Sequence, residues 1–207
     1  MHWNVWLGFV AASALIGVTP GPAVTSIVGY ALSSGRKTAL ASVAGMAVGS
    51  VIAMSLSLAG VGALLRASSM AFMMLKWAGA AYLIGLGLVT LIGARGKAPA
   101  DAPTPPPISP RAAFASNVAL GSFHPKTIVF FVAFAPQFIS PHGSYLAQAA
   151  ILVATFGAVV GATDTTYALV ASHASRLLRK PEAMLWSKRA GGGVLIAAGV
   201  ATAAVRT

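Results

Sequence analysis

Long apolar runs separated by short polar segments dominate the whole chain. A window of membrane-spanning length predicts six transmembrane helices, at about residues 3–32, 38–65, 70–92, 112–138, 145–171 and 190–206. Each run reaches the roughly 17 residues that are the minimum for crossing a hydrocarbon core. The last run is the shortest and is rich in glycine. The predicted fold class is therefore an all-α membrane protein with six transmembrane helices.

The composition agrees with this pattern and excludes several classes of protein. Hydrophobic residues make up 57% of the chain and charged residues 8%, against about 25% charged residues in soluble domains. The first apolar run lacks the basic start of a secretory signal, so it is predicted to be a transmembrane helix. The chain has no cysteine, which excludes disulfides, thiol nucleophiles and thiolate metal sites. No cofactor and no metal site is predicted.

A proline-rich segment separates the third predicted helix from the fourth. Residues 94–111 read ARGKAPADAPTPPPISPR and hold six of the chain's 12 prolines. Such a segment has polyproline character and cannot form a packed core. We predict a cytoplasmic linker at 94–111 between a first unit, residues 1–93, and a second unit, residues 112–207, with three helices each.

The basic residues predict the orientation in the membrane. The net charge of +11 would suggest nucleic acid in a soluble protein, but basic residues also gather in the cytoplasmic loops of membrane proteins. No nucleic-acid partner is therefore predicted. Both termini are predicted to be periplasmic, because ten of the 14 Lys and Arg fall in loops on one side: Arg36, Lys37, Arg95, Lys97, Arg111, Arg176, Arg179, Lys180, Lys188 and Arg189.

The two units share weak sequence similarities that indicate an internal repeat. Phe9 precedes Pro20 by 11 residues, and Phe114 precedes Pro125 by the same number. The motif TPGPA at 19–23 and the motif HPKT at 124–127 interrupt corresponding helices. Because each unit has an odd number of helices, the second unit must cross the membrane in the opposite sense. This is the inverted-repeat plan of many secondary transporters, whose interrupted helices flank a site near the membrane midplane.

Two pairs of glycines also recur in corresponding helices. Gly45 and Gly49 form a GxxxG motif in the second helix, and Gly157 and Gly161 form another in the fifth. Small residues at this spacing let two helix backbones approach closely. We predict a packing role for both pairs.

Two charged residues inside the predicted helices have no counterpart in the other unit. Asp164 is the one carboxylate within a predicted span, and an ionised carboxylate there must become protonated or find a partner. Lys126 lies deep in the fourth helix, where it could pair with Asp164, bind a substrate carboxylate, or do each in turn. A static buried ion pair is the alternative. His124 could relay protons or be an ordinary hydrogen-bonded side chain.

The backbone around Pro20 and Pro22 cannot be a regular helix, because Pro22 removes a hydrogen-bond donor. In lipid, the freed amides and carbonyls need another helix, water or a ligand as partner. A helix that restarts at Pro22 carries a partial positive charge at its first turn. This end of the helix is predicted to favour a carboxylate.

Four segments resemble the signature sequences of the lysine-exporter (LysE/RhtB) family: TPGPA at 19–23, GRKTAL at 35–40, LKWAGAAYLIGLG at 75–87 and HPKTIVFFVAFAPQF at 124–138. The resemblance extends from residue 3 to about 205. It implies a bacterial inner-membrane exporter of amino acids or close derivatives, driven by the proton gradient. The sequence departs from the family pattern at His124, where Asn is usual, and at Ser50, where His is frequent.

These observations predict a secondary exporter, not an enzyme, whose partners are an amino-acid substrate, protons and the lipid bilayer. The alternatives are an exporter of an inorganic cation, an intramembrane enzyme using His124 and Ser122, and an accessory membrane subunit. The particular amino acid and the oligomeric state stay open, a homodimer being one option. Asp164 is predicted to couple transport to protons, and the predicted substrate-binding residues are Thr19, Pro20, Gly21, Pro22, His124, Pro125 and Lys126.

Overall fold

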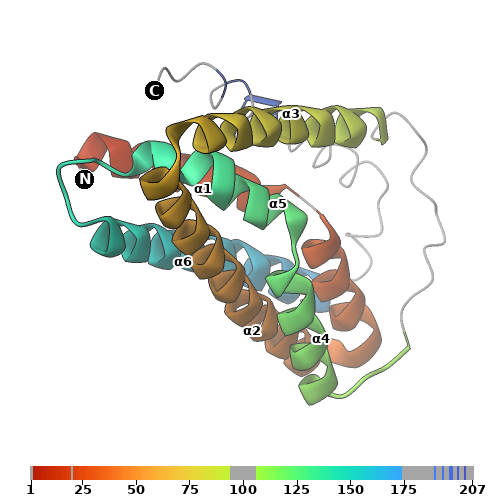
Figure 1. Cartoon of the computed structure of the whole chain (residues 1–207). Helices are drawn as coiled ribbons and strands as arrows, with labels where there is room; N and C mark the ends of the chain where they lie inside the picture. Colours follow the sequence, from red (N-terminus) through yellow and green to blue (C-terminus); the bar gives the residue numbers. More distant parts are fainter. Residues whose placement is uncertain are drawn as a thin grey trace.

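The computed structural model describes residues 2–19, 21–93 and 106–173, together with six single positions between 189 and 203. Pro20, most of the predicted linker and most of the predicted sixth helix at 190–206 lie outside the described residues. The helices are α1 (Trp3–Val18), α2 (Pro22–Ala67), α3 (Ser69–Gly93), α4 (Pro110–Ser122), α5 (Pro125–Val129) and α6 (Tyr145–His173). A π-helical turn, Phe130–Phe134, and a 3-10 turn, Ala135–Phe138, continue α5 (Figure 1).

The described part of the chain is helical wherever it has regular structure. Three stretches are long and apolar enough to cross a membrane: Pro22–Leu64, Pro110–Phe138 and Tyr145–His173. Trp3–Val18 is a shorter apolar helix. These features agree with the predicted all-α, multi-pass membrane protein. The count of six helices and the inverted repeat stay predictions.

A sharp turn at Gly35 divides α2 into two helices. Gly35 has a φ of 80° and a ψ of 178°, a conformation that residues with a Cβ rarely adopt. The turn separates the first and second predicted spans. Arg36 and Lys37 are exposed beside it, and α4 begins with an exposed Arg111 at the same end of the molecule (Figure 1).

Both predicted helix interruptions are present. The first span breaks between α1 and α2, and the fourth breaks at Phe123 and His124, between α4 and α5. Proline is the first residue of α2, α4 and α5. Proline suits this position because its missing N–H would have no partner inside the helix.

Glycine allows α2 and α4 to pack with their backbones in contact. A Cβ on Gly45 would collide with the carbonyl oxygen of Phe114, and a Cβ on Gly49 with that of Val118. The packing role predicted for this pair is therefore confirmed. Gly157 and Gly161 on α6 differ, since no heavy atom of the described residues lies within 4 Å of their Cβ positions. For this second pair the described residues show no such contact, and the packing role stays a prediction.

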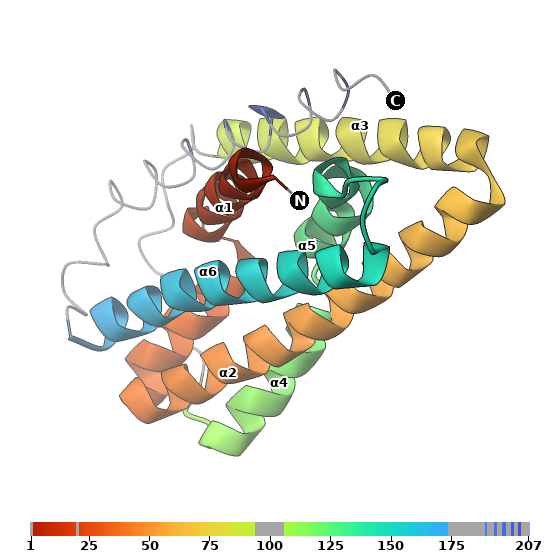
Figure 2. The same cartoon turned by 90° about the vertical axis from the view of Figure 1, so that its left-hand side faces the viewer.

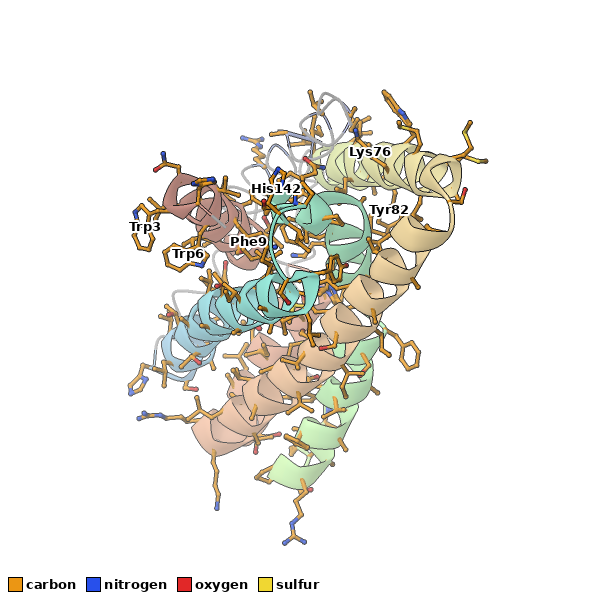
Figure 3. The ribbon with its side chains drawn as sticks, turned by 60° about the vertical axis from the view of Figure 1, so that its left-hand side comes forward. Trp3, Trp6, Phe9, Lys76, Tyr82 and His142 are labelled. Atoms are coloured by element: carbon orange, nitrogen blue, oxygen red, sulfur yellow. The ribbon has the colours of Figure 1, made fainter. Side chains whose placement is uncertain are left out.

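Two apolar clusters lie on opposite sides of a central region of α2 and α6. The aromatic cluster lies toward the end at which Trp3, Trp6 and His142 are found (Figure 3). Helices α2 and α6 pack against each other (Figure 2) and contribute residues to both clusters. The aliphatic cluster lies toward the Gly35 turn and comprises Ile27, Ala31, Ala39, Val43, Ala168 and Ala171. The buried members of the aromatic cluster are Phe9, Ile16, Met54, Leu58, Phe130, Phe131, Phe134, Ala135, Ala149, Leu152 and Phe156.

Candidate functional site

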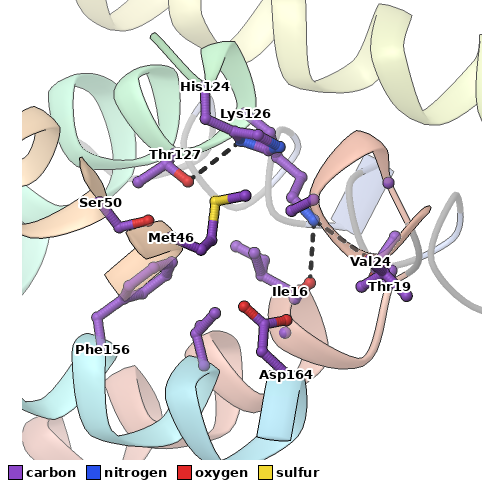
Figure 4. Close-up of a pocket in the computed structure, with 14 residues that line it drawn as sticks. Ile16, Thr19, Val24, Met46, Ser50, His124, Lys126, Thr127, Phe156 and Asp164 are labelled. Atoms are coloured by element: carbon purple, nitrogen blue, oxygen red, sulfur yellow. Dashed lines mark hydrogen bonds between the residues drawn. The ribbon is translucent and has the colours of Figure 1, made fainter. Parts of the chain in front are cut away.

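A small cavity lined by both polar and apolar residues lies between the two apolar clusters, where both helix breaks meet (Figure 4). Its volume of about 30 Å³ is enough for about two water molecules. A bound amino acid therefore requires the surrounding helices to separate. The cavity is lined by Ile16, Gly17, Thr19, Gly21, Ala23, Val24, Met46, Ser50, His124, Lys126, Thr127, Phe156, Val160 and Asp164.

The ammonium group of Lys126 lies at the carboxyl end of α1. It donates to the carbonyl oxygen of Ile16 at 3.1 Å and to that of Thr19 at 3.3 Å. The last carbonyls of a helix lack partners within the helix and carry a partial negative charge. A Cβ on Gly21 would lie 3.9 Å from Lys126 Nζ. Lys126, from the second helix break, therefore offsets the partial negative charge at the end of α1 and lies beside Gly21 in the first break.

Two hydroxyl groups bind other carbonyls in the last turn of α1. The Thr19 hydroxyl donates to the carbonyl of Leu15 at 2.8 Å. The Tyr167 hydroxyl, from α6, donates to the carbonyl of Val18 at 2.8 Å. Side chains from two other helices thus bind the end of α1, as burial of a helix end in a membrane requires.

Asp164 lies on α6 at the opposite wall of the cavity from His124 (Figure 4). Its side chain is 4% exposed, and it makes no hydrogen bond to a described residue. It also forms no direct ion pair with Lys126, whose ammonium is bound to the α1 carbonyls. The two charged groups therefore share one cavity without being locked together, so the alternative of a static ion pair is not observed.

His124 is the residue directly before α5, and its imidazole is 4% exposed. Its Nδ1 is 3.3 Å from the hydroxyl of Thr127, one turn further along the chain. Its Nε2 is buried and has no hydrogen-bond partner in the part of the chain described. Buried polar atoms without partners are uncommon in folded proteins, so this nitrogen marks a place where the cavity can bind another group.

The predicted site residues divide into two sets. Lys126, His124 and Asp164 line the cavity together with Thr19 and Gly21. Pro22 and Pro125 are exposed and do not line it, although each starts a helix beside it. Pro20 lies outside the described residues.

The structure adds residues that the sequence did not single out. Thr127 orients His124, and Met46 and Phe156 form apolar parts of the wall. Ser50 and His124, the two departures from the family pattern, line the same cavity. The spacing of His124 and Thr127, three residues apart at the start of a helix, was the one available signal for that pair.

A buried asparagine outside the cavity was also missed. Asn117 on α4 is 1% exposed. Its amide donates to the carbonyl of Ser42 at 3.2 Å and accepts from the hydroxyl of Ser26 at 3.0 Å. It therefore joins α4 to both parts of α2. The sequence alone does not show whether an uncharged asparagine in an apolar helix joins two helices by hydrogen bonds or is simply buried.

The arrangement presents a cation, a carboxylate and free helix-end groups at the centre of a membrane protein. The first turn of α2 lines the cavity through Ala23 and Val24, whose amides precede the first hydrogen bond within that helix. These groups match the charges of a zwitterion. In the described residues no group of three or more His, Asp or Glu side chains is placed to hold a metal ion.

Comparison with known proteins agrees with this chemistry. A family model described as LysE type translocator matches residues 14–204. A protein of Salmonella typhimurium named homoserine/homoserine lactone efflux protein is 32% identical over 207 residues, covering 100% of this chain and 99% of the relative. An uncharacterised membrane protein of Vibrio cholerae is 30% identical over 207 residues, covering 100% of both chains. No solved structure matches the chain.

Proposed function

Because the chain belongs to the LysE type translocator family, we propose that it exports amino acids or close derivatives across the bacterial inner membrane in exchange for protons. The observation that carries this proposal is the presence of Lys126 and Asp164 in one cavity where two broken helices meet. The efflux named for the Salmonella relative supports the same class of substrate.

The substrate carboxylate binds between Lys126 and the first turn of α2. The amides of Ala23 and Val24 lie at the positive end of that helix, where an anion is stabilised. Gly21 lies directly beside the Lys126 ammonium. The carboxylate therefore takes over the ammonium from the carbonyls of Ile16 and Thr19.

The substrate ammonium then binds at the groups that have lost Lys126. The carbonyls of Ile16 and Thr19 attract a cation, and ionised Asp164 lines the same cavity. In the free carrier, the Lys126 ammonium stands where the substrate ammonium will bind. Substrate binding in this scheme exchanges one ammonium for another and leaves no charge without a partner.

Access to the cavity alternates between the two apolar clusters. Exposed Arg36, Lys37 and Arg111 lie at the Gly35 end, which supports a cytoplasmic position for that end and for the aliphatic cluster. Separation of the aliphatic cluster admits substrate, and separation of the aromatic cluster releases it outside. The proposed frame is two inverted units of three helices, residues 1–93 and 112–207, with the linker inside and both termini outside.

Proton entry drives release. Protonation of Asp164 from outside removes the negative charge that holds the substrate ammonium, and the proton leaves inside after the carrier returns. A proton that moves inward gains about 2.3 kcal/mol per 100 mV of membrane potential. This is enough for a concentration gradient of more than tenfold, because a factor of ten requires about 1.4 kcal/mol.

Efflux from loaded vesicles carrying Asp164→Asn tests the proposal. The amide keeps the size of the side chain but cannot change its charge. We therefore expect the increase in efflux rate caused by an imposed pH gradient to be at least tenfold smaller than in the unmodified protein. Substrate exchange without a gradient should decline less. Asp101→Asn, in the predicted linker, is the matched control. Undiminished pH-driven efflux by Asp164→Asn would remove this residue from the mechanism.

A further inference from the structure

The turn at Gly35 divides α2 into two arms that are held by different kinds of contact. The second arm, residues 36–67, lies with its backbone against that of α4 at Gly45 and Gly49, where an added methyl group would collide (Figure 2). Backbones packed this closely leave little freedom for relative movement, so α4 and the second arm form one unit. The first arm, residues 22–34, is joined to this unit by side chains.

Two side-chain hydrogen bonds join the first arm to α4. The Ser26 hydroxyl donates to Oδ1 of Asn117 at 3.0 Å, and the Tyr30 hydroxyl donates to that of Ser116 at 3.4 Å. The second bond is long and exposed, whereas Asn117 is buried. The Asn117 amide also donates to the Ser42 carbonyl on the second arm. Asn117 therefore fastens the first arm to the unit formed by α4 and the second arm.

The Ser26 hydroxyl has a second acceptor in its own helix, the carbonyl of Ala23 at 3.1 Å. A hydroxyl has one proton and can rotate it from one acceptor to another. If the first arm moves away from α4, Ser26 therefore keeps a partner, and Oδ1 of Asn117 can accept from water that enters the gap. The bond can break without leaving a donor unpaired, which would be costly inside a membrane protein.

The apolar contacts of the first arm are also small. The arm contributes Ile27 and Ala31 to the aliphatic cluster, in which four of the six buried residues are alanines. The aromatic cluster, by contrast, has five phenylalanines among its buried residues. The stabilisation gained from an apolar contact increases with the area that it buries. Separating the first arm from its neighbours therefore costs less than opening the aromatic cluster.

One end of the first arm is fixed, and the other end forms part of the cavity. The amide of Ile108 donates to the hydroxyl of Ser34 at 3.0 Å, directly beside Gly35. At the other end, Ala23 and Val24 line the cavity. Gly35 has no Cβ to restrict its dihedral angles. A rotation about Gly35 therefore moves the cavity wall while the connection to the second arm stays in place.

We propose that the first arm of α2 is the inner gate of the carrier, and that Asn117 is the positioning residue that holds this gate closed. The gate rests on the proposed export function and specifies which element moves when the cavity opens toward the cytoplasm. The Ser26 bond breaks, the first arm turns about Gly35 away from α4, and the cavity widens enough to admit an amino acid.

Thiol labelling of the full chain in lipid nanodiscs follows the gate without a transport assay. The chain has no cysteine, so a single introduced cysteine gives the whole signal. Ala31→Cys reports on the aliphatic cluster and Ala149→Cys on the aromatic cluster, because both positions are buried in their clusters. A charged thiol reagent reacts with a buried cysteine only when the surrounding contacts open.

Ser26→Ala removes the bond to Asn117 and leaves Asn117 bound to the second arm. From the average strength of a hydrogen bond between membrane helices, we expect labelling of Ala31→Cys to become about threefold faster or more. Labelling of Ala149→Cys should stay the same or become slower, because alternating access opens one gate at a time. A general loosening of the protein would instead accelerate labelling at both positions.

Thr25→Val is the matched control on the same arm. It removes a hydroxyl that donates to a carbonyl of its own chain segment, that of Gly21 at 3.0 Å, and it should leave labelling at both positions unchanged. Asn117→Ala should accelerate labelling of Ala31→Cys at least as much as Ser26→Ala does. Size-exclusion profiles in detergent identify any variant that fails to fold.

Cross-linking tests whether the gate must move during transport. Ser26→Cys combined with Asn117→Cys, joined by a bifunctional thiol reagent with a short spacer, fixes the first arm to α4. Amino-acid efflux should then fall about tenfold or more and recover when the link is reduced. Ser42→Cys combined with Asn117→Cys links α4 to the second arm instead. Because these two elements move together, this link should leave most of the efflux intact.

The outcomes separate the gate from the export function. The gate is refuted, while export stands, if Ser26→Ala leaves labelling of Ala31→Cys unchanged or accelerates labelling equally at both positions. Undiminished efflux with the first arm linked to Asn117→Cys would refute it as well. If the protein transports no amino acid, the export function is refuted, and the labelling rates alone decide whether the first arm opens.

Discussion

The break between α1 and α2 presents mainly backbone groups to the cavity, whereas the break between α4 and α5 presents side chains. In the first break, the carbonyls of Ile16 and Thr19 accept from another helix, and Gly21 adds no side chain. In the second break, His124 and Lys126 both point into the cavity (Figure 4). Its own backbone closes locally, since the amide of His124 donates to the carbonyl of Gly121.

This difference shows how two similar interruptions divide one task. In the proposed carrier, the first break supplies fixed dipoles whose position depends on the helices, and these recognise the charges shared by all amino acids. The second break supplies groups that can move and differ in chemistry. Among the described residues, Lys126 donates from the second break to carbonyls of the first, while no side chain of the first break donates to the second.

The largest effect is expected from removing the side chain that joins the two breaks. Lys126→Met keeps the length of the side chain but removes the cation, so the substrate carboxylate loses its charged partner and the α1 carbonyls lose their donor. We expect the efflux rate from loaded vesicles to fall about 100-fold or more, equivalent to about 2.7 kcal/mol. The thermal midpoint in detergent should also fall.

Lys37→Met is the matched control, because Lys37 is an exposed lysine beside the Gly35 turn. It should leave both measurements close to those of the unmodified protein. Lys126→Arg keeps the charge but adds volume to a small cavity, so partial efflux is expected. If Lys126→Met exports substrate at the rate of the unmodified protein, the second break adds no essential charge. The proposed division of roles between the two breaks would then be wrong.

The two glycine pairs extend the comparison from the breaks to the packing of the two units. Gly45 and Gly49 bring α2 against the backbone of α4, whereas Gly157 and Gly161 have open space at their Cβ positions within the described structure. The related positions Phe9 and Phe114 differ in the same way, being 0% and 38% exposed. Within the described structure, similar sequence features are therefore packed more closely in the first unit than in the second.

Alanine at one glycine of each pair tests this contrast. Gly49→Ala places a methyl group against the carbonyl of Val118, so α2 and α4 must move apart, at a cost of about 1–3 kcal/mol. Gly161→Ala meets nothing among the described residues and should change stability by less than about 0.5 kcal/mol. Chemical denaturation in mixed micelles measures both. Equal losses would mean that α6 packs as tightly as α2 through residues that the described structure does not include.

The features that the sequence predicted are those that follow from simple physical rules acting on single residues. Apolar length predicted a protein of long apolar helices, and proline predicted the breaks at Pro22 and Pro125. The cost of charge in hydrocarbon predicted that Lys126 and Asp164 need partners inside the membrane. The structure places both residues in one cavity. None of these predictions required knowledge of helix rotation.

The parts that the sequence could not predict depend on rotation and on contacts between distant residues. GxxxG motifs look alike in α2 and α6, and only the position of α4 distinguishes them. The Lys126 ammonium binds carbonyls instead of Asp164 because the end of α1 lies closer to it, which no residue pattern reveals. Ser50 was a departure from a family pattern, and its cavity position depends on the way α2 faces α4.

The smallest expected effect concerns the other side chain that supports the first break. Tyr167→Phe removes the hydroxyl that donates to the Val18 carbonyl at 2.8 Å and leaves the ring. Hydrogen bonds between membrane helices contribute about 0.6 kcal/mol on average, so the thermal midpoint should fall by about 1–2 °C. Amide hydrogen exchange should rise in the last turn of α1 and stay unchanged around His124, because the second break closes within its own backbone.

Tyr30→Phe is the matched control, because it removes a tyrosine hydroxyl elsewhere, one that lies 3.4 Å from the Ser116 hydroxyl. Faster exchange around both breaks would show that they are mutually supported, and the one-directional dependence inferred from Lys126 would then be wrong.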